Sequence, residues 1–165
     1  MAALLTNGPI DLDALIRAVA TLEDGAIVTF LGTARRHSEG KVVLALRYEA
    51  YAAMAEKALE EIVTAAQAKW PGTRVVVQHR LGACPLGETS VAVVAVSPHR
   101  AEAFAACRFV IDTVKLDAPI WKQELFADGT AWVGDPSSYR AAAADRPLRK
   151  DDARAPTRPK DGGAR

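Results

Sequence analysis

Cysteine is scarce in this chain of 165 residues, in which Cys84 and Cys107 are the only two. With no CxxC pair and no further cysteine, the sequence offers neither a disulfide framework nor the spacing of a zinc site. We predict no metal ion and, since the chain also lacks a phosphate-binding glycine loop, no cofactor. Cys107 lies on an apolar stripe with helical spacing, so we expect this thiol to pack in the core.

The chain also lacks a long hydrophobic run, since its longest strongly apolar stretch is residues 91–96. A membrane-spanning helix needs about 20 apolar residues. No basic residue precedes Leu4 and Leu5, and no apolar stretch of useful length follows them, so we identify no signal peptide. From these absences we expect no membrane association and a cytoplasmic location.

Neither sign of charge is in excess, because 21 Lys and Arg residues face 20 Asp and Glu residues. Residues 146–165 hold seven of those basic residues and three of the acidic ones, which leaves the rest of the chain slightly acidic. A general nucleic-acid-binding protein would show a basic face or stripe. We therefore predict no nucleic-acid partner and expect any basic cluster in the folded part to be a local site.

What the chain does have is a regular hydrophobic pattern, which predicts a single α+β domain with intermixed helices and strands. The expected helices cover residues 12–19, 52–69 and 98–116, and the expected strands cover 26–31, 42–51, 74–81, 89–97 and 120–126, followed by a hairpin to residue 132. The run at 91–96 shows no alternation, so both of its faces should be covered. In the last helix we expect a buried stripe of Phe104, Cys107, Ile111 and Val114.

We divide the chain into a folded domain at residues 1–140 and a tail at residues 141–165. The tail is basic and contains several Pro and Gly residues, but its one large aliphatic residue is Leu148. Such a composition cannot bury enough apolar surface to fold, so we expect the tail to be disordered.

The first candidate site is the sequence Ser97-Pro98-His99-Arg100, between a predicted strand and a predicted helix. Ser97 is a favourable N-cap, and Pro98 suits the first helical position. The free N–H groups of a first helical turn bind phosphate or carboxylate. His99 and Arg100 place cations against the helix dipole, which is unfavourable unless an anion lies between them. A capped helix with a solvated His and Arg is the alternative.

The second candidate site is the polar loop after Gly32, in which Arg35 and Arg36 could chelate a phosphate through their guanidinium groups. Most loop arginines are simply solvated. If this loop meets the turn at Ser97 in space, the two would form one anion pocket.

The third candidate site is the pair Lys115 and Lys122. Lys115 ends a helix, where a cation is favoured without any function. Lys122 follows Trp121 on a strand, and Glu124 shares its face because strand side chains alternate. Lys122 could be a paired structural lysine, or a catalytic amine whose pKa is tuned by burial. We interpret His79 as a structural residue.

Together these stretches resemble the MoaE family, the large catalytic subunit of molybdopterin synthase. The resemblance covers roughly residues 8–133. The segments that carry it are GAIVTFLGTAR at 25–35, LRYEAY at 46–51, HRLG at 79–82 with Gly87-Glu88, SPHR at 97–100 with Ala103-Phe104, and Lys115 followed by APIWKQE at 118–124.

The resemblance implies an α/β hammerhead-type fold with a mixed or antiparallel sheet and flanking helices. It also implies a homodimer that binds two copies of a small ubiquitin-like sulfur-carrier subunit, forming a heterotetramer. The implied reaction is sulfurtransferase chemistry in molybdenum cofactor biosynthesis. The carrier's C-terminal Gly-Gly thiocarboxylate gives sulfur to cyclic pyranopterin monophosphate and so forms the dithiolene of molybdopterin.

The resemblance further implies that Lys115 and Lys122 are catalytic. The implied substrate site consists of Thr33, Ala34, Arg35, His99, Arg100, Lys115, Lys122, Gln123 and Glu124. Whether Arg35 or Arg36 makes the main phosphate contact is left open. Two other functions also remain open, a non-catalytic module that binds a pterin or nucleotide phosphate, and an enzyme that forms a Schiff base on Lys122.

Overall fold

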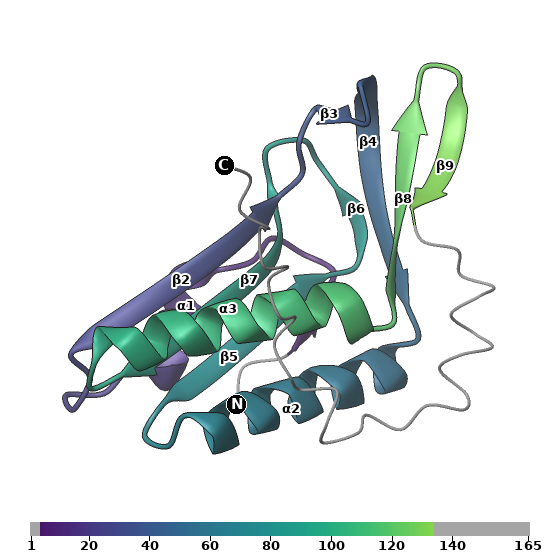
Figure 1. Ribbon diagram of the computed structural model, residues 1–165. Helices are drawn as coiled ribbons and strands as arrows, with labels where there is room; N and C mark the ends of the chain where they lie inside the picture. Colours follow the sequence, from purple (N-terminus) through teal and green to yellow (C-terminus); the bar gives the residue numbers. More distant parts are fainter. Residues whose placement is uncertain (1–3, 134–165) are drawn as a thin grey trace, which may run out of the picture.

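The computed structural model describes residues 4–133, in which three helices accompany two β-sheets (Figure 1). The elements are β1 (Leu5–Thr6), α1 (Leu12–Val19), β2 (Ala26–Thr33), β3 (His37–Ser38), β4 (Lys41–Ala50), α2 (Ala52–Lys69), β5 (Arg74–Arg80), β6 (Gly82–Cys84), β7 (Thr89–Ser97), α3 (Arg100–Asp117), β8 (Ile120–Phe126) and β9 (Gly129–Val133). The predicted tail lies outside the described residues. Within them, no helix is long and apolar enough to cross a membrane.

The strands form two sheets, which confirms the predicted α+β class. In the first sheet the order is β1-β5-β7-β2, with β1 parallel to β5 and the other neighbours antiparallel. The second sheet has the order β3-β4-β8-β9 and is antiparallel, with β6 also pairing with β4. Figure 1 shows the second sheet standing beyond the C-terminal end of α3.

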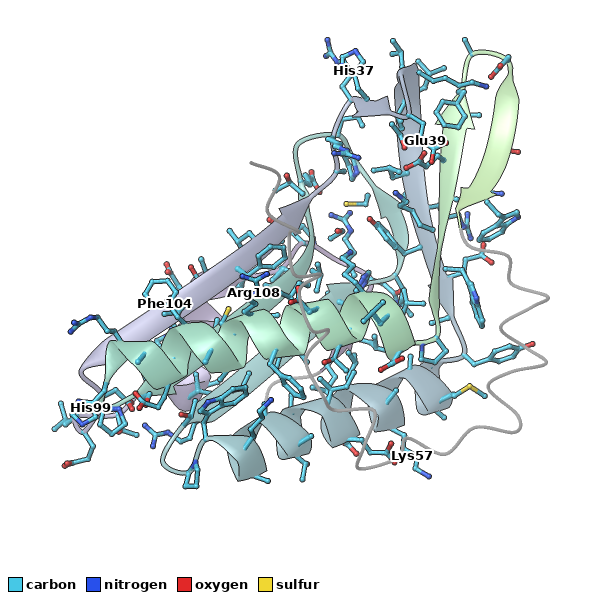
Figure 2. The ribbon with its side chains drawn as sticks, in the orientation of Figure 1. His37, Glu39, Lys57, His99, Phe104 and Arg108 are labelled. Atoms are coloured by element: carbon cyan, nitrogen blue, oxygen red, sulfur yellow. The ribbon has the colours of Figure 1, made fainter. Side chains whose placement is uncertain are left out.

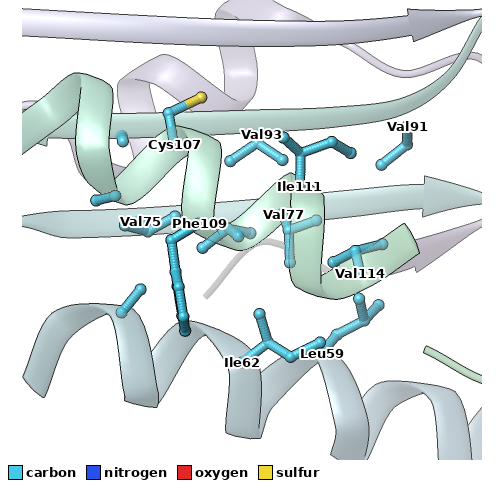
Figure 3. Close-up of a cluster of buried hydrophobic side chains, with 14 of the residues drawn as sticks. Leu59, Ile62, Val75, Val77, Val91, Val93, Cys107, Phe109, Ile111 and Val114 are labelled. Atoms are coloured by element: carbon cyan, nitrogen blue, oxygen red, sulfur yellow. The ribbon is translucent and has the colours of Figure 1, made fainter. Parts of the chain in front are cut away.

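The core is built around the central strand β7, whose residues 91–96 have no exposed surface. The odd-numbered residues of this run pack with α2 and α3 (Figure 3). The even-numbered residues pack with α1 on the other face. Both faces are therefore covered, as the lack of alternation predicted. Each fully buried valine stabilises the fold by about 1.5–3 kcal/mol relative to an exposed one.

Cys107 belongs to this core, as predicted. The thiol is buried in the same cluster as Val93 and Val110, between α3 and the first sheet. Burial raises the pKa of Cys107 to about 11, so the side chain stays a thiol and packs as a small apolar group.

Two predictions about α3 were wrong. Phe104 is 63% exposed rather than buried, because the smaller Ala103 and Ala106 occupy the helical face toward the sheet. The N-cap is His99 rather than Ser97. Ser97 remains the last residue of β7 because it pairs with Ala26 of β2 and is buried there.

Gly25 lies in the turn before β2 and packs closely against the turn after β7. A Cβ at this position would overlap the backbone carbonyl oxygen of Pro98. We expect Gly25→Ala to lower the free energy of unfolding by about 1–3 kcal/mol, as overpacking in a tight site does. Urea denaturation measures this, and Gly8→Ala is the control, because a Cβ there meets only the Thr6 Oγ1 atom at 3.9 Å. Equal stability of the two variants would contradict the prediction.

Candidate functional site

A cavity of about 510 Å³ lies where the C-terminal end of α3 meets the two sheets. Side chains from α3, β8 and the end of β2 line its wall. Five of the residues predicted for the substrate site are among them, namely Thr33, Arg35, Lys115, Lys122 and Glu124. The structure thus gathers residues from three distant parts of the sequence around one space.

Strand pairing and the chain reversal after α3 place the two lysines. Lys115 lies in the last turn of α3, and the chain turns at Pro119 into β8. In β8, Lys122 is paired with Tyr48 and Glu124 with Leu46 across the antiparallel ladder with β4. Tyr48 and Leu46 line the cavity, and directly paired residues lie on the same face of a sheet. Lys122 and Glu124 therefore face the cavity as well.

Lys122 and Glu124 form a close ion pair, with 2.6 Å between Nζ and Oε1. Glu124 is 3% exposed. Burial alone would raise the pKa of its carboxyl, but the hydrogen bonds from Lys122 and Ser38 and the charge of Arg35 lower it. Glu124 is therefore a carboxylate that fixes the position of the Lys122 amine, as the shared strand face predicted.

Lys115 lines the cavity from the last turn of α3 and, although partly open to solvent, has no carboxylate partner among the described residues. Burial lowers the pKa of Lys115, and the positive charge of Lys122 lowers it further. Two cations that repel one another in a partly buried space favour a ligand with negative charge. The arrangement is therefore suited to hold anionic groups.

Backbone hydrogen bonds fix the loop that carries Arg35. The N–H of Ala34 donates to the Glu88 carbonyl at 2.9 Å, and the Ala34 carbonyl accepts from the Gly87 N–H at 2.7 Å. The Arg80 guanidinium holds the same turn through an ion pair with the Glu88 carboxylate. Ala34 itself is buried beneath the loop and does not line the cavity.

Arg35 and Arg36 were left as alternative phosphate ligands. Arg35 lines the cavity. Arg36 is exposed and does not line it, and the Arg36 carbonyl accepts a hydrogen bond from the Val43 N–H at 2.7 Å. Of the two arginines, Arg35 is therefore the one placed to contact a ligand in the cavity.

His99 and Arg100 are not at this cavity. They lie at the opposite end of α3 from Lys115, about 22 Å away for 15 residues of helix. Figure 2 shows His99 at the end of the molecule that points away from the second sheet. Within one chain, the basic pair and the lysine pair do not form a single site.

The strand register shows that the loop after Gly32 and the turn at Ser97 also lie at opposite ends of the molecule's first sheet. Ala26 pairs with Ser97 at one end of β2, whereas Thr33 pairs with Thr89 at the other end. The loop after Gly32 and the turn at Ser97 therefore do not meet within one chain. Gln123 is also absent from the cavity, because it alternates with Lys122 and so lies on the other face of β8.

Three polar side chains on the cavity wall were not predicted as site residues: Tyr48, His79 and Ser90. The Tyr48 and His79 rings meet edge to face with centroids 4.9 Å apart. Burial raises the pKa of Tyr48, whose hydroxyl is hydrogen-bonded to Ser90. The Ser90 hydroxyl in turn donates to the Gly32 carbonyl at 3.0 Å. In the sequence these residues lie in segments with the pattern of ordinary half-buried strands. Only the arrangement of the strands in the structure shows that the three side chains reach the cavity.

The cavity offers no set of metal ligands. Across residues 4–133, no three His, Cys, Asp or Glu side chains lie close enough together to hold a metal ion. Of the residues on the cavity wall, His79 and Glu124 are the only members of these types. The chemistry of the wall is instead that of cations and hydrogen-bonding groups.

Sequence comparison supports a family assignment. Residues 5–117 match the model of the MoaE protein family. The molybdopterin synthase catalytic subunit of Oryza sativa subsp. indica is 44% identical over 157 residues, which cover 95% of this chain and 81% of the relative. The subunit with the same name from Bacillus subtilis (strain 168) is 40% identical over 131 residues, which cover 79% of this chain and 83% of the relative.

Solved structures agree with the sequence comparison. Molybdopterin synthase from Staphylococcus aureus superposes with a TM-score of 0.78 at 34% identity, covering 82% of this chain and 99% of that chain. Molybdopterin cofactor biosynthesis protein E from Burkholderia multivorans has a TM-score of 0.68 at 42% identity, covering 81% and 90%. This chain is therefore an enzyme of molybdenum cofactor biosynthesis, and it belongs to the MoaE family.

Proposed function

We propose that this protein catalyses sulfur transfer in the cavity. The donor is the C-terminal thiocarboxylate of a small ubiquitin-like carrier, and the acceptor is cyclic pyranopterin monophosphate, which becomes molybdopterin. One observation carries the proposal: Lys115, Lys122 and Arg35 line a single cavity, with Glu124 fixing one of the amines. A protein of the same fold from Helicobacter pylori was solved as a complex of subunits 1 and 2 of molybdopterin-converting factor. We propose a comparable small-subunit partner for this chain.

The charges of the two reactants explain why cations are needed. The thiocarboxylate and the cyclic phosphate are both anions, so they repel one another as they approach. Ammonium and guanidinium groups offset that repulsion and stabilise negative charge that develops on the acyl oxygen. We assign Lys115 to the carrier's C-terminal carbonyl and Lys122 to the pterin.

The bond changes follow from these positions. The thiocarboxylate sulfur forms a bond to a substrate carbon with its own electron pair. The carbon–oxygen bond at that carbon breaks, and the departing oxygen takes a proton from a lysine ammonium. The sulfur then joins the carrier's acyl group to the pterin as a thioester, and water must cleave the acyl–sulfur bond to free the product.

His99 and Arg100 remain in the proposed substrate site, but their position requires a second copy of the chain. Neither residue can reach the cavity of its own chain, because the length of α3 separates them from it. In the proposed homodimer, the α3 N-terminus of one copy supplies His99 and Arg100 to the phosphate bound by the other. Both residues are exposed and so are available for such a contact.

The direct test is incubation with thiocarboxylated carrier and cyclic pyranopterin monophosphate, followed by mass spectrometry. We expect a dithiolene product and a carrier that ends in an ordinary carboxylate. Carrier with an unmodified carboxylate terminus is the control and should give no product. Tight substrate binding without turnover would indicate a binding module instead, and a borohydride-trapped adduct on Lys122 would indicate a Schiff-base enzyme.

A further inference from the structure

We propose that His79 is the general base that activates the water molecule for cleavage of the acyl–sulfur bond. The inference rests on the proposed function, because the bond exists only if sulfur is transferred from an acyl carrier. His79 lies on β5 and is 3% exposed, yet it lines the cavity that holds the two lysines.

A single hydrogen bond fixes the tautomer of His79. Its Nδ1 lies 2.9 Å from the backbone carbonyl oxygen of Arg80. A carbonyl oxygen can only accept, so Nδ1 must carry the proton. In a neutral imidazole, Nε2 then has a free lone pair. Edge-to-face packing against Tyr48 holds the ring in this orientation.

Of the titratable groups on the described cavity wall, His79 is the one suited to accept a proton. Lys115 and Lys122 have no lone pair as ammonium ions, and in the proposed reaction sequence the lysine that protonates the departing oxygen regains a proton from solvent before the acyl–sulfur bond is cleaved. The Glu124 carboxylate is occupied by its ion pair with Lys122. Burial raises the pKa of Tyr48, so its hydroxyl remains protonated and cannot receive another proton.

The surroundings keep His79 uncharged before substrate binds. Burial, partly opposed by the hydrogen bond to the Arg80 carbonyl, and the charge of Lys115 lower the pKa of His79 to about 4. Bound anions offset the lysine charges, which raises that pKa and strengthens the base when the site is occupied. The titratable and charged groups that share the cavity with His79 are Arg35, Tyr48, Lys115, Lys122 and Glu124.

The proposed step balances. The water oxygen attacks the acyl carbon while one of its protons moves to Nε2 of His79. The acyl carbon–sulfur bond then breaks, and its electron pair leaves on the sulfur. The imidazolium returns its proton to that sulfur, which leaves a thiol on the pterin, a carboxylic acid on the carrier and a neutral His79 for the next cycle.

The test is rapid-quench mass spectrometry of His79→Asn with thiocarboxylated carrier and cyclic pterin. The Asn amide can still donate to the Arg80 carbonyl, but it has no group in place of Nε2. We expect the carrier–pterin adduct to form normally and to break down about 10²-fold more slowly, so that it accumulates. Hydroxylamine, which cleaves thioesters, should release the accumulated adduct.

Val77→Ala is the matched control, because Val77 lies fully buried on the same strand but outside the cavity wall. It should lose stability without accumulating adduct. Adduct breakdown at the wild-type rate in folded His79→Asn, or equal accumulation in Val77→Ala, would overturn the assignment of His79. If the wild-type protein forms neither adduct nor product, it is the proposed function that fails.

A second measurement needs no variant. Nitrogen-15 NMR of the wild-type protein with labelled histidine reports which ring nitrogen of His79 carries the proton. We expect Nε2 to be unprotonated at neutral pH, both alone and with the carrier bound. A proton on Nε2 under these conditions would remove the only acceptor that the proposal uses and would overturn it even if His79→Asn does not fold.

Discussion

Replacing Lys115 or Lys122 with Ala should reduce single-turnover product formation by about 10²-fold or more, as the loss of an acid or of electrostatic stabilisation does. Both lysines line one cavity, so each substitution removes a positive charge from the place where the two anionic reactants meet. Carrier binding should remain nearly intact. Rapid-quench turnover with saturating thiocarboxylated carrier measures the effect.

Lys57→Ala is the matched control for the two lysine variants. Lys57 lies on α2 with its side chain 77% exposed and pairs with Glu61 one helical turn away. Exposed pairs of this kind contribute about 0.3–0.5 kcal/mol, so neither turnover nor folding should change measurably. If Lys115→Ala and Lys122→Ala also convert substrate at the wild-type rate, the two cavity lysines have only a structural role.

Arg100→Ala and His99→Ala should weaken substrate binding more than they affect folding. Each loses a charge-assisted hydrogen bond to the phosphate, which costs about 1.5–3 kcal/mol of binding free energy. Both side chains are exposed and make no cap hydrogen bond, so unfolding should change little. Calorimetric titration with the cyclic phosphate measures the affinity. Arg108→Ala, on an exposed part of the same helix, is the control (Figure 2).

Mixing two impaired variants, at a substrate concentration too low to saturate Arg100→Ala, tests whether the basic pair acts across a dimer. In a mixed dimer of Arg100→Ala and Lys115→Ala, one cavity carries both defects and the other carries none. After subunit exchange in an equal mixture, activity should recover to about one quarter of the wild-type value. A mixture no more active than the separate variants would show that His99 and Arg100 do not complete a neighbouring cavity.

Local sequence patterns were sufficient to predict most of the elements. The unbroken apolar run at 91–96 specified a strand covered on both faces, and the structure confirms it. The spacing of Lys122 and Glu124 correctly placed both on one face of β8. These predictions succeeded because residue periodicity alone determines the side of an element on which a side chain lies.

The predictions that failed depend on contacts between distant segments. The start of α3 is set by the pairing of Ser97 with Ala26, which no local capping rule can see. His79 and Tyr48 reach the cavity only because β5 and β4, in different sheets, end near the same helix. The predicted helix at 98–116 already implied that Arg100 and Lys115 lie at opposite ends; what the sequence could not show is that the cavity lies at the Lys115 end.

The complete burial of residues 91–96 also has a consequence for motion. Amides in such a strand exchange with solvent only when the whole domain opens, so β7 is among the most slowly fluctuating parts of the molecule. Ser90 at one end of this strand borders the cavity, and Ser97 at the other end leads directly to His99. In the proposed dimer, the stiffness of β7 keeps constant the distance between the cavity of each copy and the basic pair that it supplies to its neighbour.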